Sequence, residues 1–366
     1  MRAAVMTAVH KPLEILDLKQ EGPKVGEVRV KTKAAGVCMS DWHIMIGDWP
    51  MPMPMVLGHE AAGEVVEIGP GVTNTKVGDH VIFSFRENCG HCTYCTKGRV
   101  VLCTGRNAAP RGRLFDGTAR MFLNGEPVNQ MARIGTFAES VVCAAEMVVP
   151  VRKDLPWTHA AIIGCSVATG VGAVTRHAKI EAGATVAVVG CGGVGLNIVQ
   201  GARLAGARTI IAIDLLDNKL GYAKTFGATH TINAKTEKDV PKAVKALTGG
   251  LGVEYSFDAI GSQITAQQCI EMCAPAGHAT LVGIPAVTTT ATFSPFMMVF
   301  TEKKLTGSYY GSVRPSVDFP ILADLSMSKR LDLDSLISRT YKFDEINEGF
   351  KNLAAGTVAR GVILFD

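Results

Sequence analysis

Four cysteines lie within one short stretch of the chain, and their spacing suits a metal ion. Cys89, Cys92, Cys95 and Cys103 are separated by two, two and seven residues. A disulfide pair, an iron–sulfur cluster and a zinc ion each need thiols of this kind. The bacterial cluster signature has three residues before its fourth cysteine and a proline after it, whereas here seven residues intervene and Thr104 follows. We predict a four-thiolate zinc site, which has no open position and serves structure.

A second group of possible metal ligands is scattered along the chain. Cys38, His59 and Cys165 each stand close to a glycine. Thiolates and imidazoles are ligands that zinc prefers. No spacing rule joins residues so far apart, and each is equally compatible with a buried place in a core. The two groups together suggest two metal sites of different kinds.

A glycine-rich turn points to a redox cofactor. The run Gly190-Cys191-Gly192-Gly193-Val194-Gly195 fits G-x-G-x-x-G, and it stands between an apolar strand pattern and a helical pattern. Glycines allow a tight turn and a close approach of the backbone to a pyrophosphate, which the amino end of the helix attracts. Asp214 follows Gly195 by nineteen residues, so its carboxylate is expected to accept hydrogen bonds from an adenosine ribose, which favours NAD over NADP. Lys219 is a further candidate for this ribose.

Composition limits the class of protein. The chain has 366 residues, 47% of them hydrophobic, which is enough for two cores. Its 37 basic and 33 acidic residues are spread without long runs, so nucleic acid and membrane surfaces are poor candidates as partners. Ten cysteines without an apolar leader predict a reducing, cytoplasmic location, where thiols serve metals and disulfides are disfavoured.

The elements that must position these residues differ between the two halves of the chain. Alternating apolar residues at 27–31, 62–69, 76–82 and 137–142 predict short antiparallel strands of a small barrel. Prolines at alternate positions make 49–55 an extended loop, which either connects elements or lines an apolar pocket.

From residue 185 onward, strand and helix patterns alternate. Strands are expected at 185–189, 209–213, 229–232, 254–258, 279–282 and 305–309. This alternation predicts a parallel sheet with helices on both faces, hence an α/β fold for this half. The chain is completed by a helix near 316–329, an amphipathic helix that opens at 344–347 and a last strand at 361–365, and we expect this tail to return to the first domain.

Five separated motifs occur in the order typical of one family. The four-cysteine loop, the glycine turn, Cys38 with Ser40 and His43, Gly58-His59-Glu60 with Gly63, and Gly164-Cys165 with Thr169-Gly170 resemble the zinc-dependent medium-chain alcohol dehydrogenases. The loop between Cys103 and Phe137 resembles the longer forms, which include class III (glutathione-linked formaldehyde) and actinobacterial alcohol dehydrogenases. The resemblance implies a GroES-like partly open barrel at 1–166 and a Rossmann NAD-binding domain at 167–306, with 307–366 completing the catalytic domain.

The resemblance also assigns roles around a catalytic zinc. It implies that Cys38, His59 and Cys165 bind this ion, with its fourth position open to water or substrate. Glu60 would sit behind the metal, and Asp41 would orient the ring of His59. Ser40 would accept the proton of the alcohol, and His43 would pass it to solvent through the cofactor ribose.

Substrate and cofactor contacts follow from the same resemblance. Phe85, Met131 and Ala132, with Trp42 and Trp49 nearby, would form an apolar substrate pocket. Because Ala132 stands where many relatives have a bulkier residue, a primary aryl or medium-chain alcohol is expected. The residues implied at the cofactor are Thr169, Val282 and Ile284 at the nicotinamide, and Arg360 at a phosphate. Met39 replaces an Arg or His of many relatives, which predicts weaker NAD binding and faster cofactor release.

The predicted function is therefore oxidation of a primary alcohol to its aldehyde with NAD and two zinc ions per chain. One alternative is a thiol-dependent formaldehyde dehydrogenase, acting on an S-hydroxymethyl thiol adduct. A second, from another class, is a non-catalytic zinc- and NAD-binding redox sensor. The family resemblance implies a homodimer or homotetramer joined through the cofactor domains.

Overall fold

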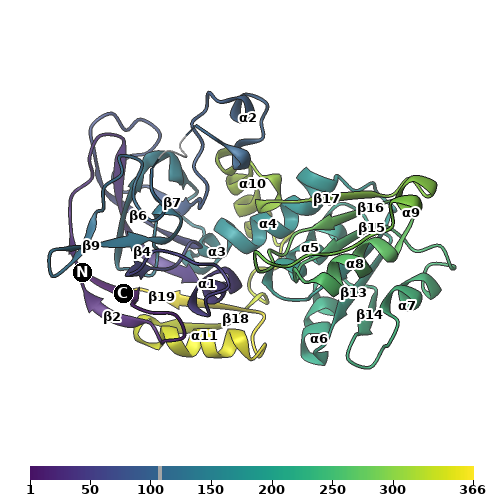
Figure 1. Ribbon diagram of the computed structural model, residues 1–366. Coiled ribbons are helices and arrows are strands. Elements are labelled where there is room, and N and C mark those ends of the chain that lie inside the picture. The colour runs from purple at the N-terminus through teal and green to yellow at the C-terminus, as the bar shows by residue number, and fades with distance from the viewer. Residues whose placement is uncertain (106–108) are drawn as a thin grey trace. The chain divides into compact units, whose positions relative to one another are not determined.

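The computed structural model describes residues 1–105 and 109–366, which form two compact units. The first unit comprises residues 1–165 and 314–366, and the second comprises residues 166–313. In Figure 1 the first unit has the purple, blue and yellow ribbons, and the second has teal and green ones. Both ends of the chain therefore belong to the unit that contains the scattered metal ligands.

The first unit is built on two largely antiparallel sheets, each of which contains one parallel strand pair. One has the strand order β2-β1-β5-β9-β8-β3, and the other has β11-β7-β6-β4-β19-β18 with β10 added beside β4. The strands are β1 (Arg2–Met6), β2 (Glu14–Asp17), β3 (Lys19–Gln20), β4 (Glu27–Gly36), β5 (Met55–Val56), β6 (Ala61–Ile68), β7 (His80–Phe83), β8 (Met121–Leu123), β9 (Glu126–Gln130), β10 (Ser140–Ala144), β11 (Val148–Pro150), β18 (Ile337–Lys342) and β19 (Arg360–Leu364).

Strand β4 is the central element of the larger sheet. Its residues are mostly buried, and it pairs with β6 along one edge. Its other edge is shared, because β10 pairs with its first half and β19 with its last residues. The carboxyl-terminal strand thus closes the sheet that the amino-terminal half begins. Helices of this unit are α1 (Met39–Met45), α2 (Thr93–Thr96), α3 (Trp157–Ile162), α10 (Pro315–Met327) and α11 (Ile346–Ala354).

The second unit is a doubly wound parallel sheet. Its order is β14-β13-β12-β15-β16-β17, and every neighbouring pair is parallel. The strands are β12 (Thr185–Val189), β13 (Thr209–Asp214), β14 (His230–Asn233), β15 (Val253–Asp258), β16 (Cys273–Leu281) and β17 (Lys304–Gly307). The helices are α4 (Ala168–Gly172), α5 (Gly193–Leu204), α6 (Asp217–Phe226), α7 (Val240–Ala246), α8 (Gln263–Glu271) and α9 (Pro295–Phe300). The α/β fold class, with a Rossmann sheet and a β-rich GroES-like barrel, is confirmed.

Several boundaries differ from those expected, and the structure explains two of these differences. The second unit extends to Val313 and not to residue 306. The short 3₁₀ turn η6 (Tyr310–Ser312) packs against α4 of the same unit, and the two backbones approach so closely that a Cβ on Gly311 would lie 2.6 Å from the carbonyl oxygen of Ala168. In the barrel, the strand expected at 76–82 begins only at His80, because residues 76–79 form a turn in which the Asp79 carboxylate accepts from the amide of Lys76.

One helical run, 157–178, is long and apolar enough to cross a membrane by length and composition. Its most apolar window is 89% buried inside the protein, which is the position of a core helix. The run carries Cys165 in a π-helical segment, η4 (Ile163–Val167). π-helical segments are rare overall, but those that occur often lie at functional sites.

Candidate metal centres and cofactor site

The fold brings the scattered ligands together in the first unit. Cys38 caps the amino end of α1 directly after β4, His59 and Glu60 precede β6, and Cys165 lies in η4. One ligand atom from each of Cys38, His59, Glu60 and Cys165 lies within 4.8 Å of the others, and all four residues are buried. The Sγ atom of Cys165 is 3.3 Å from Nε2 of His59. The cluster contains the three ligands expected for the catalytic zinc, together with Glu60.

Strand pairing explains why these residues meet. Ala35 of β4 pairs with Ala61 of β6, so the end of one strand lies beside the start of the other. The amide of Gly36 donates to the carbonyl oxygen of Glu60 over 2.7 Å, and a Cβ on Gly36 would lie only 2.7 Å from Cδ of Glu60. Glycine is therefore required here, because any larger side chain would displace Glu60.

Asp41 fixes the orientation of the His59 ring. Its buried carboxylate lies 3.3 Å from Nδ1 of His59 and accepts a hydrogen bond of 2.8 Å from the amide of Gly58. Because a carboxylate only accepts, Nδ1 carries the proton and Nε2 faces the thiols. This is the arrangement that the sequence predicted for Asp41.

The charges around His59 favour a bound cation. Burial lowers the pKa of His59, but Asp41 and Cys38 raise it to about 10. The hydrogen bond with Cys165 holds the pKa of the Cys38 thiol well below its usual value, and Arg360 and His59 lower it further against the effect of burial. The negative charges of Asp41 and of the thiolates favour a cation at this position, and two thiolates with one imidazole leave a fourth position for an oxygen ligand.

Glu60 forms a buried ion pair with Arg360 of β19. The two side chains are 0% and 4% exposed, so neither is an ordinary surface charge. The sequence predicted Arg360 at a cofactor phosphate, and that contact stays a prediction. Its guanidinium lies next to the metal-binding cluster in the first unit, a partnership that the sequence did not indicate.

The expected proton-transfer residues lie on α1. Ser40 and His43 are three residues apart, which places them as neighbours on one side of this helix. Both are partly buried. Nδ1 of His43 lies 2.7 Å from Oδ2 of Asp48, and the ring of Trp49 stacks on the imidazole with centroids 5.0 Å apart. Asp48 was not among the candidates from the sequence; its only signal is its position after Gly47, five residues beyond His43.

Some of the residues predicted to line the substrate pocket lie beside the metal-binding cluster. The ring of Phe85 meets the His59 imidazole edge to face at 5.4 Å. Met131 is buried, and Ala132 has a φ of 48°, in the left-handed region that branched side chains avoid. Trp42 instead stacks on Phe350 of α11, with centroids 6.4 Å apart. The pocket itself stays a prediction.

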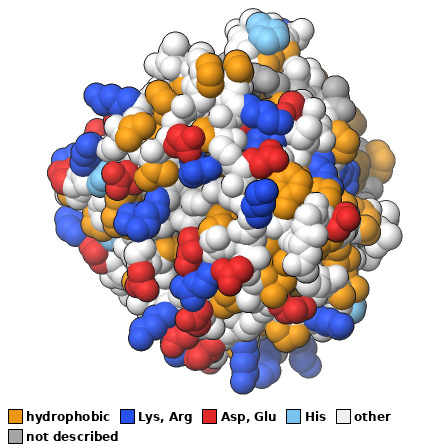
Figure 2. Space-filling view, turned by 90° about the vertical axis from the view of Figure 1, so that its left-hand side faces the viewer, with side chains coloured by type: hydrophobic (Ala, Val, Ile, Leu, Met, Phe, Trp, Pro, Cys, Tyr) orange, Lys and Arg blue, Asp and Glu red, His pale blue; other side chains and the backbone are white. Residues whose placement is uncertain are grey.

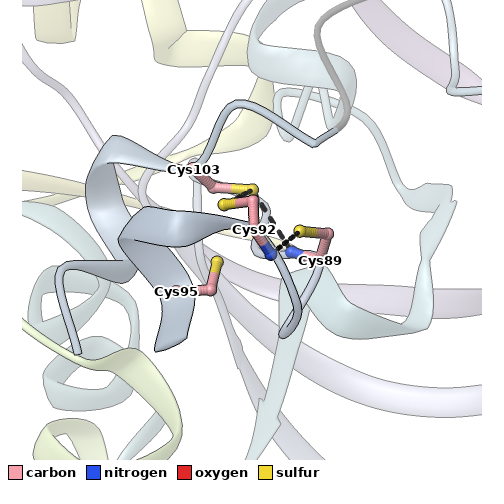
Figure 3. Close-up of side chains that lie close together, drawn as sticks. All are labelled: Cys89, Cys92, Cys95 and Cys103. Atoms are coloured by element: carbon pink, nitrogen blue, oxygen red, sulfur yellow. Dashed lines mark hydrogen bonds between the residues drawn. The ribbon is translucent and has the colours of Figure 1, made fainter. Parts of the chain in front are cut away.

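The four-cysteine loop forms the second cluster of metal-binding side chains. Figure 3 shows the four thiols converging, with Cys95 on the short helix α2. The sulfurs of Cys92 and Cys103 are 3.9 Å apart, close to the separation of about 3.8 Å that a tetrahedral zinc with four bonds of about 2.3 Å imposes. The amides of Cys89 and Cys92 donate to the sulfurs of Cys103 and Cys89, each over 3.3 Å. The loop's own backbone thus supports anionic sulfurs.

The thiols of this loop differ in environment. Hydrogen bonds with the backbone at Cys95 and Thr104 lower the pKa of Cys92 to about 5, whereas burial raises the pKa of Cys95 to about 12. Arg86 connects the loop to the barrel, because its Nε and Nη2 donate to the carbonyl oxygens of Val101 and Cys103 over 3.1 and 3.3 Å. The four thiols of the loop therefore fit a structural zinc ion whose coordination has no open position.

The glycine turn of the second unit fits a dinucleotide. Gly192 caps α5, and a Cβ there would meet nothing within 4 Å, so the space above the helix terminus is open. A Cβ on Gly195 would lie 1.7 Å from the carbonyl oxygen of Gly190, which excludes other residues. Asp214 ends β13, and its Oδ2 accepts from the amide of Cys191 over 2.7 Å. These features match a pyrophosphate cradle with a ribose-binding carboxylate beside it.

The other predicted cofactor residues are divided between the units. Thr169 and Val282 are buried, Ile284 is 48% exposed and Lys219 is partly buried, all in the second unit. Met39 is 42% exposed at the start of α1 in the first unit. Their contacts with NAD stay predictions.

The described part of the face in Figure 2 carries no large patch of one charge that would attract a charged polymer such as nucleic acid. Basic and acidic side chains are interspersed across the described residues of this face. This agrees with the small net charge of +4.

Two family models match the chain. Residues 24–153 match the alcohol dehydrogenase GroES-like domain, and residues 193–328 match the zinc-binding dehydrogenase family. The first segment contains the four-cysteine loop, and the second begins within the glycine turn, at Gly193.

Relatives and solved structures match over the full length. An S-(hydroxymethyl)glutathione dehydrogenase of Paracoccus denitrificans is 39% identical over 100% of this chain and 99% of its own. A class-3 alcohol dehydrogenase of Cereibacter sphaeroides is 38% identical, with 100% and 99% covered. The crystal structure of benzyl alcohol dehydrogenase from Acinetobacter calcoaceticus superposes with a TM-score of 0.93 at 33% identity, covering 100% of this chain and 99% of the other.

Proposed function

The chain belongs to the zinc-dependent medium-chain alcohol dehydrogenase family, and we propose that it oxidises a primary alcohol to the aldehyde with NAD, reversibly. The observation that carries the proposal is the convergence of Cys38, His59 and Cys165, with Asp41 behind the imidazole. The reaction converts alcohol and NAD⁺ into aldehyde, NADH and one proton. Zinc and NAD are the cofactors of this family.

Each cofactor supplies one part of the chemistry. Zinc bound by Cys38, His59 and Cys165 supplies a Lewis acid that lowers the pKa of an alcohol hydroxyl. NAD bound at the glycine turn supplies the two-electron acceptor for the hydride. Asp41 holds the His59 ring so that Nε2 faces the metal position, and the four-cysteine loop keeps its part of the barrel folded.

The proton leaves by residues of α1. In the proposed path, the Ser40 hydroxyl accepts the alcohol proton and releases its own toward His43 through the cofactor ribose. His43 gains a proton on one ring nitrogen and releases it to solvent, so that neither residue changes over one turnover. The 23% exposure of the His43 side chain is compatible with this exit.

The first candidate substrate is an S-hydroxymethyl thiol adduct. The relatives that are 39% and 38% identical are named S-(hydroxymethyl)glutathione dehydrogenase and class-3 alcohol dehydrogenase. These names favour the adduct over a free alcohol. Its reacting group is also a primary carbinol, so the same zinc, Ser40 and His43 would serve it.

The second candidate is a free aryl or medium-chain alcohol. Phe85 lies against His59, and Trp49, Met51 and Ala132 pack on the core of the barrel as partly buried apolar residues. Such side chains stabilise an apolar substrate better than a charged tripeptide adduct. The solved structure at 33% identity is named benzyl alcohol dehydrogenase.

NADH formation separates these candidates. The purified, zinc-replete protein is assayed with benzyl alcohol, 1-octanol and ethanol, and with formaldehyde in the presence and absence of glutathione. Activity with formaldehyde only when glutathione is added supports the adduct, whereas activity with benzyl alcohol or octanol without thiol supports the free alcohol. A protein that binds NADH and two zinc ions but turns over none of these substrates would contradict the proposal and favour the sensor alternative.

We also propose that two copies associate through the second unit. The apolar helix α9 has no buried residue, and Phe296 and Phe300 stack on each other at 5.6 Å while remaining 70% and 75% exposed. Figure 1 shows α9 next to β16 and β17, and β17 is an edge strand of the sheet. An exposed strand edge next to apolar side chains is a surface that a second copy would cover.

Light scattering tests this association. The variant Phe296→Glu is expected to give a smaller assembly than the unaltered protein, because a carboxylate would be buried without a partner. The control is Leu251→Glu, which changes another exposed apolar residue of the second unit, 68% exposed. Equal masses for both variants and the unaltered protein would contradict the proposed interface. We place the protein in the cytoplasm, where its ten cysteines would stay reduced.

A further inference from the structure

The segment after α1 folds back on His43 and encloses its ring. Gly47 has a φ of 82° and reverses the chain, so that the amide of Asp48 donates to the carbonyl oxygen of His43 over 2.9 Å. The same residue reaches the ring, with Oδ2 2.7 Å from Nδ1. Trp49 then covers one face of the imidazole, at 5.0 Å and an interplanar angle of 21°. Backbone and side chain together hold the ring from two directions.

We propose that Asp48 is a positioning residue for proton transfer: it keeps the proton of neutral His43 on Nδ1 and so presents Nε2 as the proton acceptor. This inference rests on the proposed role of His43 in the alcohol dehydrogenase reaction. Asp48 does not contact the reacting atoms in this scheme and acts only through His43.

The tautomer follows from the chemistry of the pair. A carboxylate has no proton to donate, so a hydrogen bond of 2.7 Å to Nδ1 requires the proton to be on the ring nitrogen. In a neutral imidazole the other nitrogen then has a free lone pair. That nitrogen, Nε2, is the atom that receives the proton released by Ser40 and later gives it to solvent.

The same pair serves the protonated state of the relay. When Nε2 gains its proton, the ring carries a positive charge, and the Asp48 carboxylate is already in contact with Nδ1. No rearrangement is needed to accommodate the charge, because the Asp48 side chain and the stacked Trp49 ring are in place before the transfer. A half-turn of the imidazole would keep the ring stacked on Trp49 but would break its hydrogen bond with Asp48, which favours one orientation.

The principal variant is Asp48→Asn, which keeps the size of the side chain. An amide offers both a donor and an acceptor to Nδ1, so the ring is no longer restricted to one tautomer. We expect the long-range ¹⁵N–¹H spectrum of the unaltered protein to show the Nδ1-H form of His43. The spectrum of Asp48→Asn should show a raised fraction of the Nε2-H form. The His43 signals are assigned by their absence from the spectrum of His43→Asn. This measurement needs no substrate.

Kinetics supply the second readout. We expect kcat of Asp48→Asn to fall about 10- to 100-fold with little change in KM, since orientation of a general base is lost and substrate binding is not. Added imidazole, a small external base, is expected to restore part of kcat. Asp48→Glu, which retains a carboxylate, should keep more activity than Asp48→Asn. The matched control is Asp154→Asn, an exposed aspartate paired with Arg152 on the same unit, which should leave kcat unchanged.

The outcomes separate this inference from the proposed function. If the unaltered protein oxidises no alcohol or adduct, the proposed function fails, and the spectrum alone decides whether Asp48 sets the tautomer. If the protein is active but Asp48→Asn has the same His43 spectrum and the same kcat, the inference is overturned. A fall in kcat that accompanies a lower unfolding temperature and does not respond to imidazole would also overturn it, because the role of Asp48 would then be structural.

Discussion

The two metal-binding clusters reach similar ligand sets by opposite routes. All four ligands of the cysteine loop lie between residues 89 and 103, and amides of the same segment donate to their sulfurs. The catalytic ligands lie between residues 38 and 165, and only the pairing of β4 with β6 and the path of the η4 helix bring them together. A local site depends on its own turns, whereas a dispersed site depends on the whole barrel.

The clusters also differ in what surrounds them. Cys89 and Cys92 of the loop are only partly buried, while Cys38, His59, Glu60 and Cys165 are all buried. Four thiolates fill the coordination of a zinc ion, whereas two thiolates and an imidazole leave a position for substrate. We therefore expect changes in the dispersed cluster to affect turnover, and changes in the loop to affect stability.

The largest effect is expected from loss of a catalytic ligand. Cys165→Ala should lower kcat/KM on the order of 1000-fold or more, because the Lewis acid is lost, and the zinc content should fall from two ions to one per chain. Steady-state kinetics and metal analysis measure these quantities. Cys143→Ala is the control, since this buried thiol of β10 belongs to neither cluster. A Cys165→Ala variant with full zinc content would show that the dispersed cluster does not need this thiolate.

A smaller effect on turnover is expected from Asp41, which contacts the ligand His59 and does not itself bind the metal. Asp41→Asn keeps an acceptor for Nδ1 of His59 but removes the negative charge, so activity or zinc affinity should fall about 10- to 100-fold. Competition with a chelator of known affinity measures the second quantity. Asp79→Asn, in a turn of the same barrel, serves as the control. Equal chelator sensitivity of the two variants would mean that the charge of Asp41 does not support the metal.

Loss of a loop ligand should act on stability. Cys103→Ser is expected to lower the zinc content to one ion per chain and the unfolding midpoint by about 5 to 10 °C, the shift that corresponds to a few kcal/mol in a protein of this size. Below that midpoint kcat should stay within about threefold of the unaltered value, because the loop supplies no ligand to the catalytic metal. Calorimetry and kinetics on one preparation test both parts. A large loss of kcat at an unchanged midpoint would reverse the division of roles between the clusters.

The smallest effect is expected at the contact between loop and barrel. Arg86→Ala removes two hydrogen bonds to carbonyl oxygens of the loop and should lower the midpoint by about 2 to 4 °C without changing kcat. Arg152→Ala, which removes exposed ion pairs of the same unit, is the control and should change the midpoint less. A shift no larger than that of the control would mean that the loop is stable without this contact.

The parallel sheet could be read from the sequence more fully than the barrel. Strands of a covered parallel sheet are buried on both faces, so they appear as apolar runs between helices, and β12 has the bounds expected for it. The barrel strands are short and pair with distant partners. The sequence pattern for one of them extended into a turn, and the boundary at Val313 depended on the packing of η6 on α4.

The sequence by itself determined the chemistry that is available: the four closely spaced thiols, the glycine turn with Asp214, and, through family resemblance, the identity of the dispersed ligands. Local spacing is sufficient for the first two because the chain between their parts is short. The tertiary structure alone decided that Glu60 pairs with Arg360 and that Asp48 binds His43. The first contact needs β19 to return to β4 from the far end of the chain, and the second needs a backbone reversal at Gly47 that residue types do not specify.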